Sequence, residues 1–159
     1  MKELTMEIRI QVFRPEELPE EDRELIQAAR AAAQNSYSPY SHFAVGAALR
    51  LDNGCIVCGS NQENAAYPSG MCAERTALFY AGARYPDHCV TTLAIAARHP
   101  KGWTSAPVPP CGACRQVMLE TEQRSGRPMR LLLSGSEQVY VIAGIRQLLP
   151  LQFGQSFLE

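Results

Sequence analysis

The order of helix-like and strand-like segments in this sequence predicts an α/β fold, in which one mixed five-stranded sheet carries helices on its faces. Two alternating apolar runs flank Asp52-Asn53-Gly54, a pattern that predicts a β-hairpin. The later strand-like runs are instead separated by helix-forming segments, which indicates crossover connections. A chain that combines a hairpin with crossover helices is expected to form a mixed sheet covered by helices.

The predicted elements follow one another through most of the chain. Residues 6–13 alternate apolar and polar side chains, which is typical of an additional edge strand. A helix is expected from about residue 20 to 34, because Leu25, Ala29 and Ala32 share one face at helical spacing. Five strands are predicted at residues 43–51, 55–60, 91–97, 129–135 and 139–144, and further helices at 72–84, 111–123 and 145–150.

Length and composition limit the number of domains and the classes of protein to which the chain can belong. A chain of 159 residues fills one ordinary domain, so we expect a lead-in at residues 1–19 and a single domain at 20–159. The hydrophobic fraction is 46% and the charged fraction 19%, as in globular proteins. The formal net charge is -1, and the 15 Lys and Arg are scattered among 16 Asp and Glu. This balance argues against nucleic acid as a partner.

The first 24 residues contain no unbroken apolar stretch, which argues against a signal peptide, and no later segment has the length of a membrane span. We therefore expect a cytoplasmic protein that does not contact membranes. In a reducing compartment its six cysteines should be free thiols or metal ligands.

Two Cys-x-x-Cys pairs differ in their surroundings. Cys55 and Cys58 fall in a predicted strand and should face opposite sides of the sheet, so we expect them to pack in or near the core. Cys111 and Cys114 fall on the first turn of a predicted helix, where the free N–H groups lower a thiol pKa. Taken alone, this second pair is compatible with metal binding, redox chemistry or packing.

Cys72 also lies at the start of a predicted helix, two residues before Glu74. If the two helix starts converge, the thiolates of Cys72, Cys111 and Cys114 can hold one Zn²⁺. Three protein ligands leave the fourth position open, as in catalytic zinc sites. Glu74 would then be a carboxylate beside the metal, although a first-turn carboxylate can also simply complement the helix dipole.

Cys-x-Glu followed by Pro-Cys-x-x-Cys is a form of the zinc deaminase signature. Together with residues 37–49, 61–78, 109–118 and 147–154, it closely resembles the cytidine deaminase family, in its small homotetrameric branch. The resemblance spans about residues 20–154. It implies a three-layer α/β/α fold and hydrolytic deamination of cytidine or deoxycytidine to the uridine product and ammonia, in pyrimidine salvage.

The resemblance also implies roles for single residues. Glu74 would move protons between water, ring N3 and the departing amine, and Arg75 would draw charge from the thiolates. Asn61 and Glu63 match a pair that hydrogen-bonds the ribose 3′-hydroxyl, and a carboxylate there favours a nucleoside over a nucleotide. Phe43 and Ala73 match positions that contact the base, while Phe153 matches an aromatic that enters a neighbouring subunit's site.

Several alternatives remain open. Arg75 can be a surface arginine, Asn61 and Glu63 solvated loop residues, and Phe43 a core residue of its strand. A deaminase of a modified cytosine nucleoside, of the blasticidin S type, is a second enzymatic hypothesis, although the Asn61-x-Glu63 pair favours the ordinary nucleoside. A third hypothesis is a structural zinc module. It would use a closed site of four thiolates, at Cys55, Cys58, Cys111 and Cys114.

Overall fold

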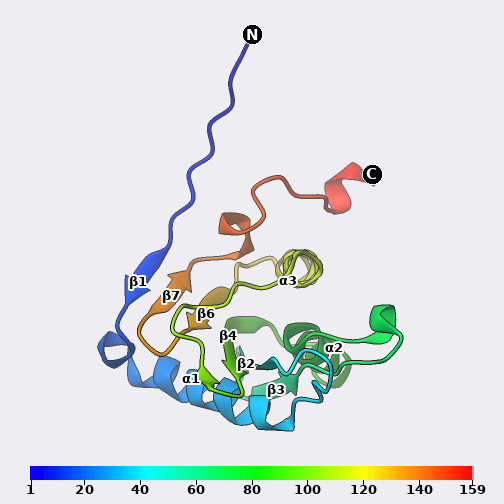
Figure 1. Ribbon diagram of the computed structural model, residues 1–159. Helices are drawn as coiled ribbons and strands as arrows, with labels where there is room; N and C mark the ends of the chain where they lie inside the picture. Colours follow the sequence, from blue (N-terminus) through cyan, green and yellow to red (C-terminus); the bar gives the residue numbers. More distant parts are fainter. Residues whose placement is uncertain (159) are drawn as a thin grey trace.

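The computed structural model describes residues 1–158 and has a mixed β-sheet at its centre (Figure 1). The strands are β1 (Gln11–Phe13), β2 (Ala44–Leu51), β3 (Ile56–Ser60), β4 (Val90–His99), β5 (Gly102–Trp103), β6 (Arg130–Ser134) and β7 (Val139–Ile142). Their order in the sheet is β1-β7-β6-β4-β2-β3, and β5 pairs with the end of β4. β4 and β6 are parallel, and the other pairs are antiparallel.

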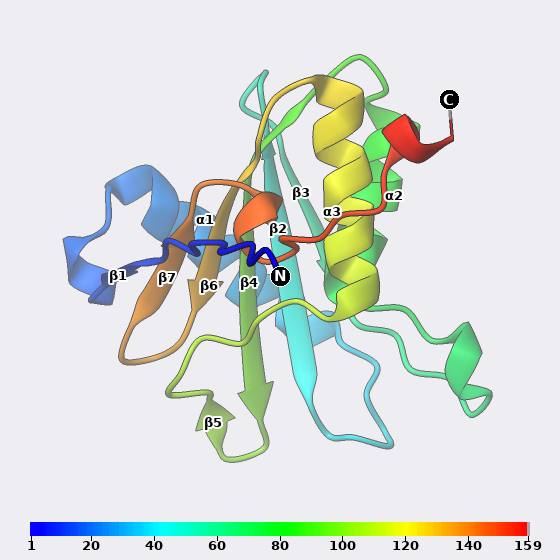
Figure 2. The ribbon, with the colours of Figure 1, turned by 90° about the horizontal axis from the view of Figure 1, so that it is seen from above.

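Three α-helices cover the sheet. α1 (Glu20–Ala32) lies on one face, and α2 (Ala73–Arg84) and α3 (Gly112–Ser125) lie on the other (Figure 2). Short 3-10 turns occur at Pro15–Glu17, Ala33–Asn35, Tyr67–Ser69, Ile145–Gln147 and Gln155–Phe157. The three-layer α/β/α architecture predicted from the sequence is therefore confirmed.

Alternation along β2 produces two separate cores. Ala47 and Leu49 face α2 and α3, whereas Ala48 faces α1, and all three side chains are fully buried. Gly46 lies so close to α1 that a Cβ atom on it would come within 1.9 Å of the Ala29 carbonyl oxygen. The absence of a side chain at this position thus allows α1 to pack directly on the sheet.

The number of strands differs from the expectation. The five strands predicted between residues 43 and 144 are all present, but two short strands, β1 and β5, extend the sheet to seven. The predicted edge strand in the lead-in is confirmed over Gln11–Phe13, which pairs with β7. β5 has only two residues, too few to leave an alternating pattern in the sequence.

The prediction that Cys55 and Cys58 pack in or near the core is wrong, although both are free thiols as expected. Both residues are exposed, because β3 is the outer strand of the sheet and Cys55 precedes its first residue.

Over residues 1–158, no helix combines the length and apolar character that crossing a membrane requires.

Candidate active site

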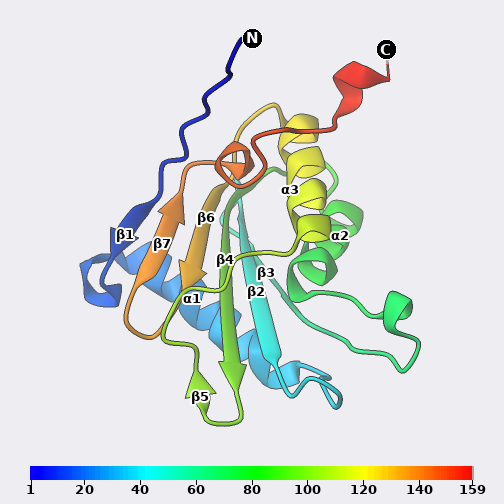
Figure 3. The same ribbon diagram turned by 45° about the horizontal axis from the view of Figure 1, so that its top comes forward.

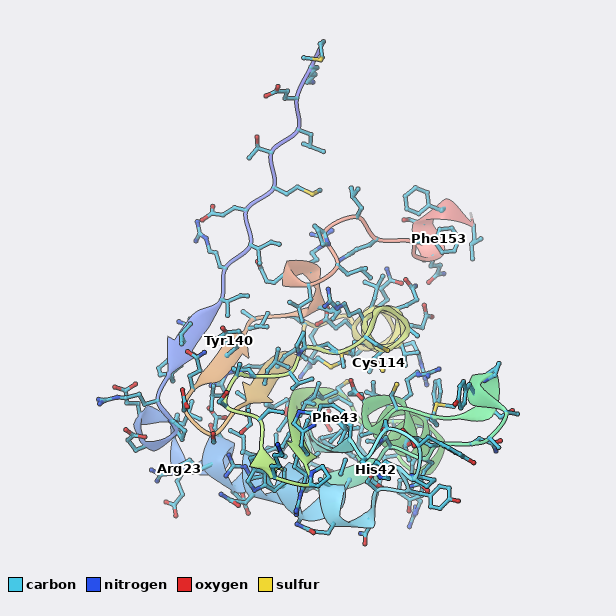
Figure 4. All side chains as sticks on the ribbon, viewed as in Figure 1. Arg23, His42, Phe43, Cys114, Tyr140 and Phe153 are labelled. Carbon is cyan, nitrogen blue, oxygen red and sulfur yellow. The ribbon has the colours of Figure 1, made fainter. Side chains whose placement is uncertain are left out.

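Two helices begin at the same place and bring three thiols together. Cys72 is the residue that caps the N-terminus of α2, and Cys111 caps α3. Cys114 follows on the first turn of α3, where it is buried between α3 and α2 (Figure 4). The Sγ atoms of Cys72 and Cys111 are 3.8 Å apart, and those of Cys111 and Cys114 3.4 Å apart. The expected convergence of the two helix starts is thus present in the fold.

The spacing of the three sulfur atoms suits one zinc ion. All three lie within 4.8 Å of one another, and they form the only such group of potential metal ligands found among residues 1–158. Tetrahedral zinc with Zn–S bonds of about 2.3 Å separates two sulfur ligands by roughly 3.8 Å. Cys55 and Cys58 do not belong to the group, which counts against a closed site of four thiolates.

The surroundings of the Cys72 thiol favour its ionised form, the thiolate, which is the form that binds metals. Hydrogen bonds from Cys114 and then from Arg75 lower the pKa of Cys72 to about 5, against the effect of its partial burial. The pKa of Cys114 is raised, first by its hydrogen bond to Cys72 and then by burial. The Arg75 guanidinium lies 3.7 Å from the Cys72 sulfur, and this contact raises the pKa of Arg75. A cation therefore lies against the Cys72 sulfur, at the residue to which the family resemblance assigns the offset of thiolate charge.

Glu74 lies on the first turn of α2, with only 4% of its surface exposed. Burial raises the pKa of its carboxyl group, and the nearby Cys72 sulfur raises it further. A carboxylate shielded from water in this way holds a proton more readily than a surface carboxylate does. Such a group suits both the acceptance and the delivery of protons near neutral pH.

A cleft of about 530 Å³ opens beside the thiols. Its walls include Asn61, Glu63, Cys72 and Arg75, so the fold brings four of the predicted site residues to one cavity. The remaining lining residues belong to two loops, one before β2 and one between β3 and α2: Tyr40, Ser41, Gln62, Asn64, Tyr67, Gly70 and Met71.

The side-chain amide of Asn61 forms three hydrogen bonds within the protein. Its Oδ1 accepts hydrogen bonds from Ser36 Oγ at 2.5 Å and the Val45 N–H at 2.8 Å. Its Nδ2 donates to the Phe43 carbonyl oxygen at 2.9 Å. An amide nitrogen carries two hydrogens, so the second is left for a ligand in the cleft.

Glu63 is held by a turn that the sequence did not single out. Its carboxylate accepts hydrogen bonds from the backbone N–H groups of Tyr40 and Ser41, at 2.9 and 3.2 Å, and from the Ser41 hydroxyl. The hydroxyl bond is the main cause of a lowered pKa, which keeps Glu63 ionised. The Ser-rich turn that precedes Phe43 was the available signal, but only the tertiary structure pairs it with Glu63.

Six predicted site residues do not line the cleft: Glu74, Cys111 and Cys114 at the thiol cluster, and the three predicted substrate contacts Phe43, Ala73 and Phe153. Phe43 is half-buried, with its ring centroid 4.8 Å from that of His99. Ala73 is fully buried at the start of α2, where its carbonyl oxygen packs closely against Gly59 of β3. Phe153 is 61% exposed on the C-terminal segment, stacked against Phe157 (Figure 4).

Trp103 is part of the packing on the other side of the sheet. Its ring lies against the core beneath α1. The guanidinium carbons of Arg30 and Arg98 are 5.2 and 5.7 Å from the ring centroid, within the range of cation–π interactions. Trp103 therefore packs against the fold and does not line the cleft beside the thiols.

Three clustered thiols and a buried carboxylate, placed at two helix starts on one face of a mixed sheet, are the arrangement of the zinc-dependent nucleobase deaminases. Residues 19–125 match the family described as cytidine and deoxycytidylate deaminase zinc-binding region. The chain belongs to this cytidine and deoxycytidylate deaminase family.

Individual relatives agree with this assignment. The chain is 48% identical over 96 residues to a cytidine deaminase of Halalkalibacterium halodurans, an alignment that covers 60% of this chain and 68% of the relative. The crystal structure of cytidine deaminase from Burkholderia pseudomallei superposes with a TM-score of 0.70 at 39% identity, over 82% of this chain and 97% of that one. The Mycobacterium tuberculosis enzyme gives a TM-score of 0.63 at 32% identity, over 82% and 95% of the two chains.

Proposed function

We propose that this chain catalyses the hydrolytic deamination of cytidine or deoxycytidine to uridine or deoxyuridine and ammonia, in the salvage of pyrimidine nucleosides. The observation that carries the proposal is the buried Glu74 beside three clustered thiols at the edge of an open cleft. The relatives at 48% and 46% identity are both cytidine deaminases, which supports the same reaction here.

Cys72, Cys111 and Cys114 would hold a single Zn²⁺ per subunit, since their spacing suits tetrahedral coordination. When bound, zinc acts as a Lewis acid that lowers the pKa of water, so that water becomes a competent nucleophile at neutral pH. Three thiolates carry more negative charge than one Zn²⁺ neutralises. Arg75 and the N-termini of α2 and α3 offset this excess.

Glu74 moves the protons of the reaction. It takes one proton from the attacking water and gives it to ring N3 of the pyrimidine. It then transfers the second proton of that water to the amino group on C4, which leaves as ammonia. Because its pKa is raised by burial, a single carboxyl group can accept and release these protons in turn.

The sugar would bind at Asn61 and Glu63. The second Nδ2 hydrogen of Asn61 and the remaining lone pair of the Glu63 carboxylate suit a hydroxyl group, which both donates and accepts. The ionised Glu63 repels a phosphate, so a nucleoside is the expected substrate.

The base would lie against Phe43 and the backbone of Ala73. Phe153 is largely exposed in the single chain, in keeping with an aromatic that completes the site of another subunit. The assembly would then be a homotetramer in which active sites are shared between subunits.

The test is loss of cytidine absorbance with purified wild type, the Glu74→Gln variant and a control, Glu120→Gln. Glu120 is an exposed carboxylate on α3, so its substitution should leave the rate unchanged. Loss of a general acid–base group should lower kcat in Glu74→Gln by about 100-fold or more. Zinc content should remain the same in all three proteins. A folded, zinc-loaded wild type that turns over neither cytidine nor deoxycytidine would contradict the proposal.

A further inference from the structure

The first ten residues form an extended segment that the catalytic fold does not use. This N-terminal arm (residues 1–10) precedes the region matched by the deaminase family, which begins at residue 19. It continues directly from β1 and extends away from the sheet and helices, on the side of α3 (Figures 1 and 3). A hydrogen bond from the Arg9 N–H to Gln147 Oε1, at 2.8 Å, connects the arm to the rest of the chain.

One face of the arm is apolar. Leu4, Met6, Ile8 and Ile10 alternate with polar residues, and they are 79%, 47%, 52% and 39% exposed. The opposite face carries Glu7 and Arg9, which form an ion pair. Strict alternation is typical of a strand with one buried face. In the single chain this face is uncovered.

The arm's own subunit is poorly placed to cover it. Residues 1–13 contain no Gly, Pro, Asn or Asp, the residues that a tight return turn normally requires. Pairing of Gln11–Phe13 with β7 fixes the direction in which the arm leaves the body. Ten extended residues span about 33 Å, enough to cross a second molecule.

The C-terminal tail (residues 150–158) offers a matching surface on the same side of the body. Leu151, Phe157 and Leu158 are 77%, 68% and 75% exposed. Both the arm and the tail extend on the α3 side of the sheet (Figures 1 and 3). Two copies related by a two-fold axis can cover each other's apolar residues reciprocally, since contacts at such an interface occur in pairs.

The charge of the arm argues against nucleic acids and anionic membranes as its partners. Lys2 and Arg9 are balanced by Glu3 and Glu7, so the side chains of residues 1–13 carry no net charge. Nucleic acids and anionic membranes attract basic segments. We propose that the apolar face of the N-terminal arm binds the C-terminal tail of a second copy of this chain.

The direct test places the photo-crosslinking residue p-benzoylphenylalanine at Ile8, on the apolar face, or at Thr5, on the polar face, of the full-length protein. After irradiation, denaturing gels should show a product of twice the chain mass for position 8 and little for position 5. Peptide mapping should locate the adduct within residues 151–158. Adducts within one chain, adducts outside the tail, or equal yields at both positions would overturn the proposal.

A second measurement uses Ile8→Glu beside Thr5→Glu, which add the same charge to opposite faces of the arm. Burial of one isoleucine corresponds to roughly a 30-fold change in a dissociation constant. Sedimentation equilibrium should show Ile8→Glu weakening self-association by about that factor or more, while Thr5→Glu matches the wild type. Zinc content should agree among the three proteins, which shows that each retains the folded metal site. Identical association constants would overturn the proposal.

Discussion

Single residues at the start of α2 and α3 show how a metal site follows from helix capping. Cys72 and Cys111 occupy the capping positions themselves, so their sulfur atoms lie where backbone N–H groups point outward. The backbone N–H of Cys114 indeed donates to the Cys111 sulfur, at 3.5 Å. Both helices thus direct partial positive charge at the same three sulfur atoms.

Substitution of single cysteines tests which thiols hold the metal. Cys72→Ala should lose most of its zinc, because two sulfur ligands leave an incomplete site. Cys55→Ala should keep one zinc per subunit, because Cys55 is exposed and lies outside the cluster. Metal analysis of both purified variants decides between these ligands, and the opposite pattern would support a closed site of four thiolates that includes Cys55.

Selection against phosphate is expected at Glu63. The carboxylate is ionised and repels a second negative charge, so cytidine monophosphate should react at least about tenfold more slowly than cytidine. Glu63→Gln keeps an acceptor for the turn at Tyr40 and Ser41 but removes the charge. The ratio of kcat/KM values for the two substrates should therefore fall in that variant. Equal rates in the wild type would refute this role.

At the level of structural elements, hydrogen bonds connect the loops that line the cleft, so the position of one loop depends on that of the other. The Glu63 carboxylate anchors the turn at residues 38–42, and Asn61 fixes the start of β2 through Phe43 and Val45. The residues proposed to bind the sugar therefore also shape the cleft. Substitutions there will change geometry as well as contacts, which makes the conservative variant Glu63→Gln more informative than alanine.

The contact between α1 and β2 depends on a glycine. A Cβ atom at residue 46 would meet the Ala29 carbonyl oxygen at 1.9 Å, so Gly46→Ala must push α1 away from the sheet. Such overpacking should destabilise the protein by about 1–3 kcal/mol, or more. Gly82→Ala is the matched control, because residue 82 lies within α2 and its nearest neighbour is the flexible side chain of Arg124, at 3.4 Å.

In that control, alanine in place of a helical glycine should stabilise by roughly 0.5–1 kcal/mol. Denaturant unfolding of both variants measures the two changes. If Gly46→Ala is as stable as the wild type, α1 can move away from the sheet without lowering the free energy of unfolding, and the prediction is wrong.

At the scale of the whole molecule, the N-terminal arm and the C-terminal tail both extend beyond the three-layer body (Figure 3). Both carry exposed apolar side chains. Contacts with α3 hold the tail: Gln116 Nε2 donates to the Phe153 carbonyl oxygen at 2.8 Å, and Gly154 is buried against the Gln123 side chain. The Phe153 ring itself remains exposed. Completion of the site by a partner subunit would explain why this aromatic is displayed and not packed.

Removal of residues 151–159 tests that idea. Stacking of an aromatic on a base is worth about 1–3 kcal/mol, so activity should fall about tenfold or more. Each subunit should keep its zinc, since the three cysteines lie outside the deleted segment. Phe153→Ala alone should reproduce most of the loss. Unchanged turnover in the truncated protein would refute the shared site.

The sequence by itself determined the elements and the chemistry of the centre. Apolar runs, alternating in the hairpin and continuous at residues 91–97, placed the main strands, and Cys72, Glu74, Cys111 and Cys114 indicated a catalytic zinc site before any geometry was known. These features are local: strand periodicity and helix starts depend on residues a few positions apart.

Only the tertiary structure decided how distant segments meet. It showed that β3 is an outer strand, which exposes Cys55 and Cys58, and that Ser41 holds Glu63. It also placed Trp103 on the side of the sheet away from the thiols, although the residue is close to Cys111 in sequence. Exposure and pairing depend on strand order and helix packing, which bring together residues far apart in the chain and leave no local pattern in the sequence.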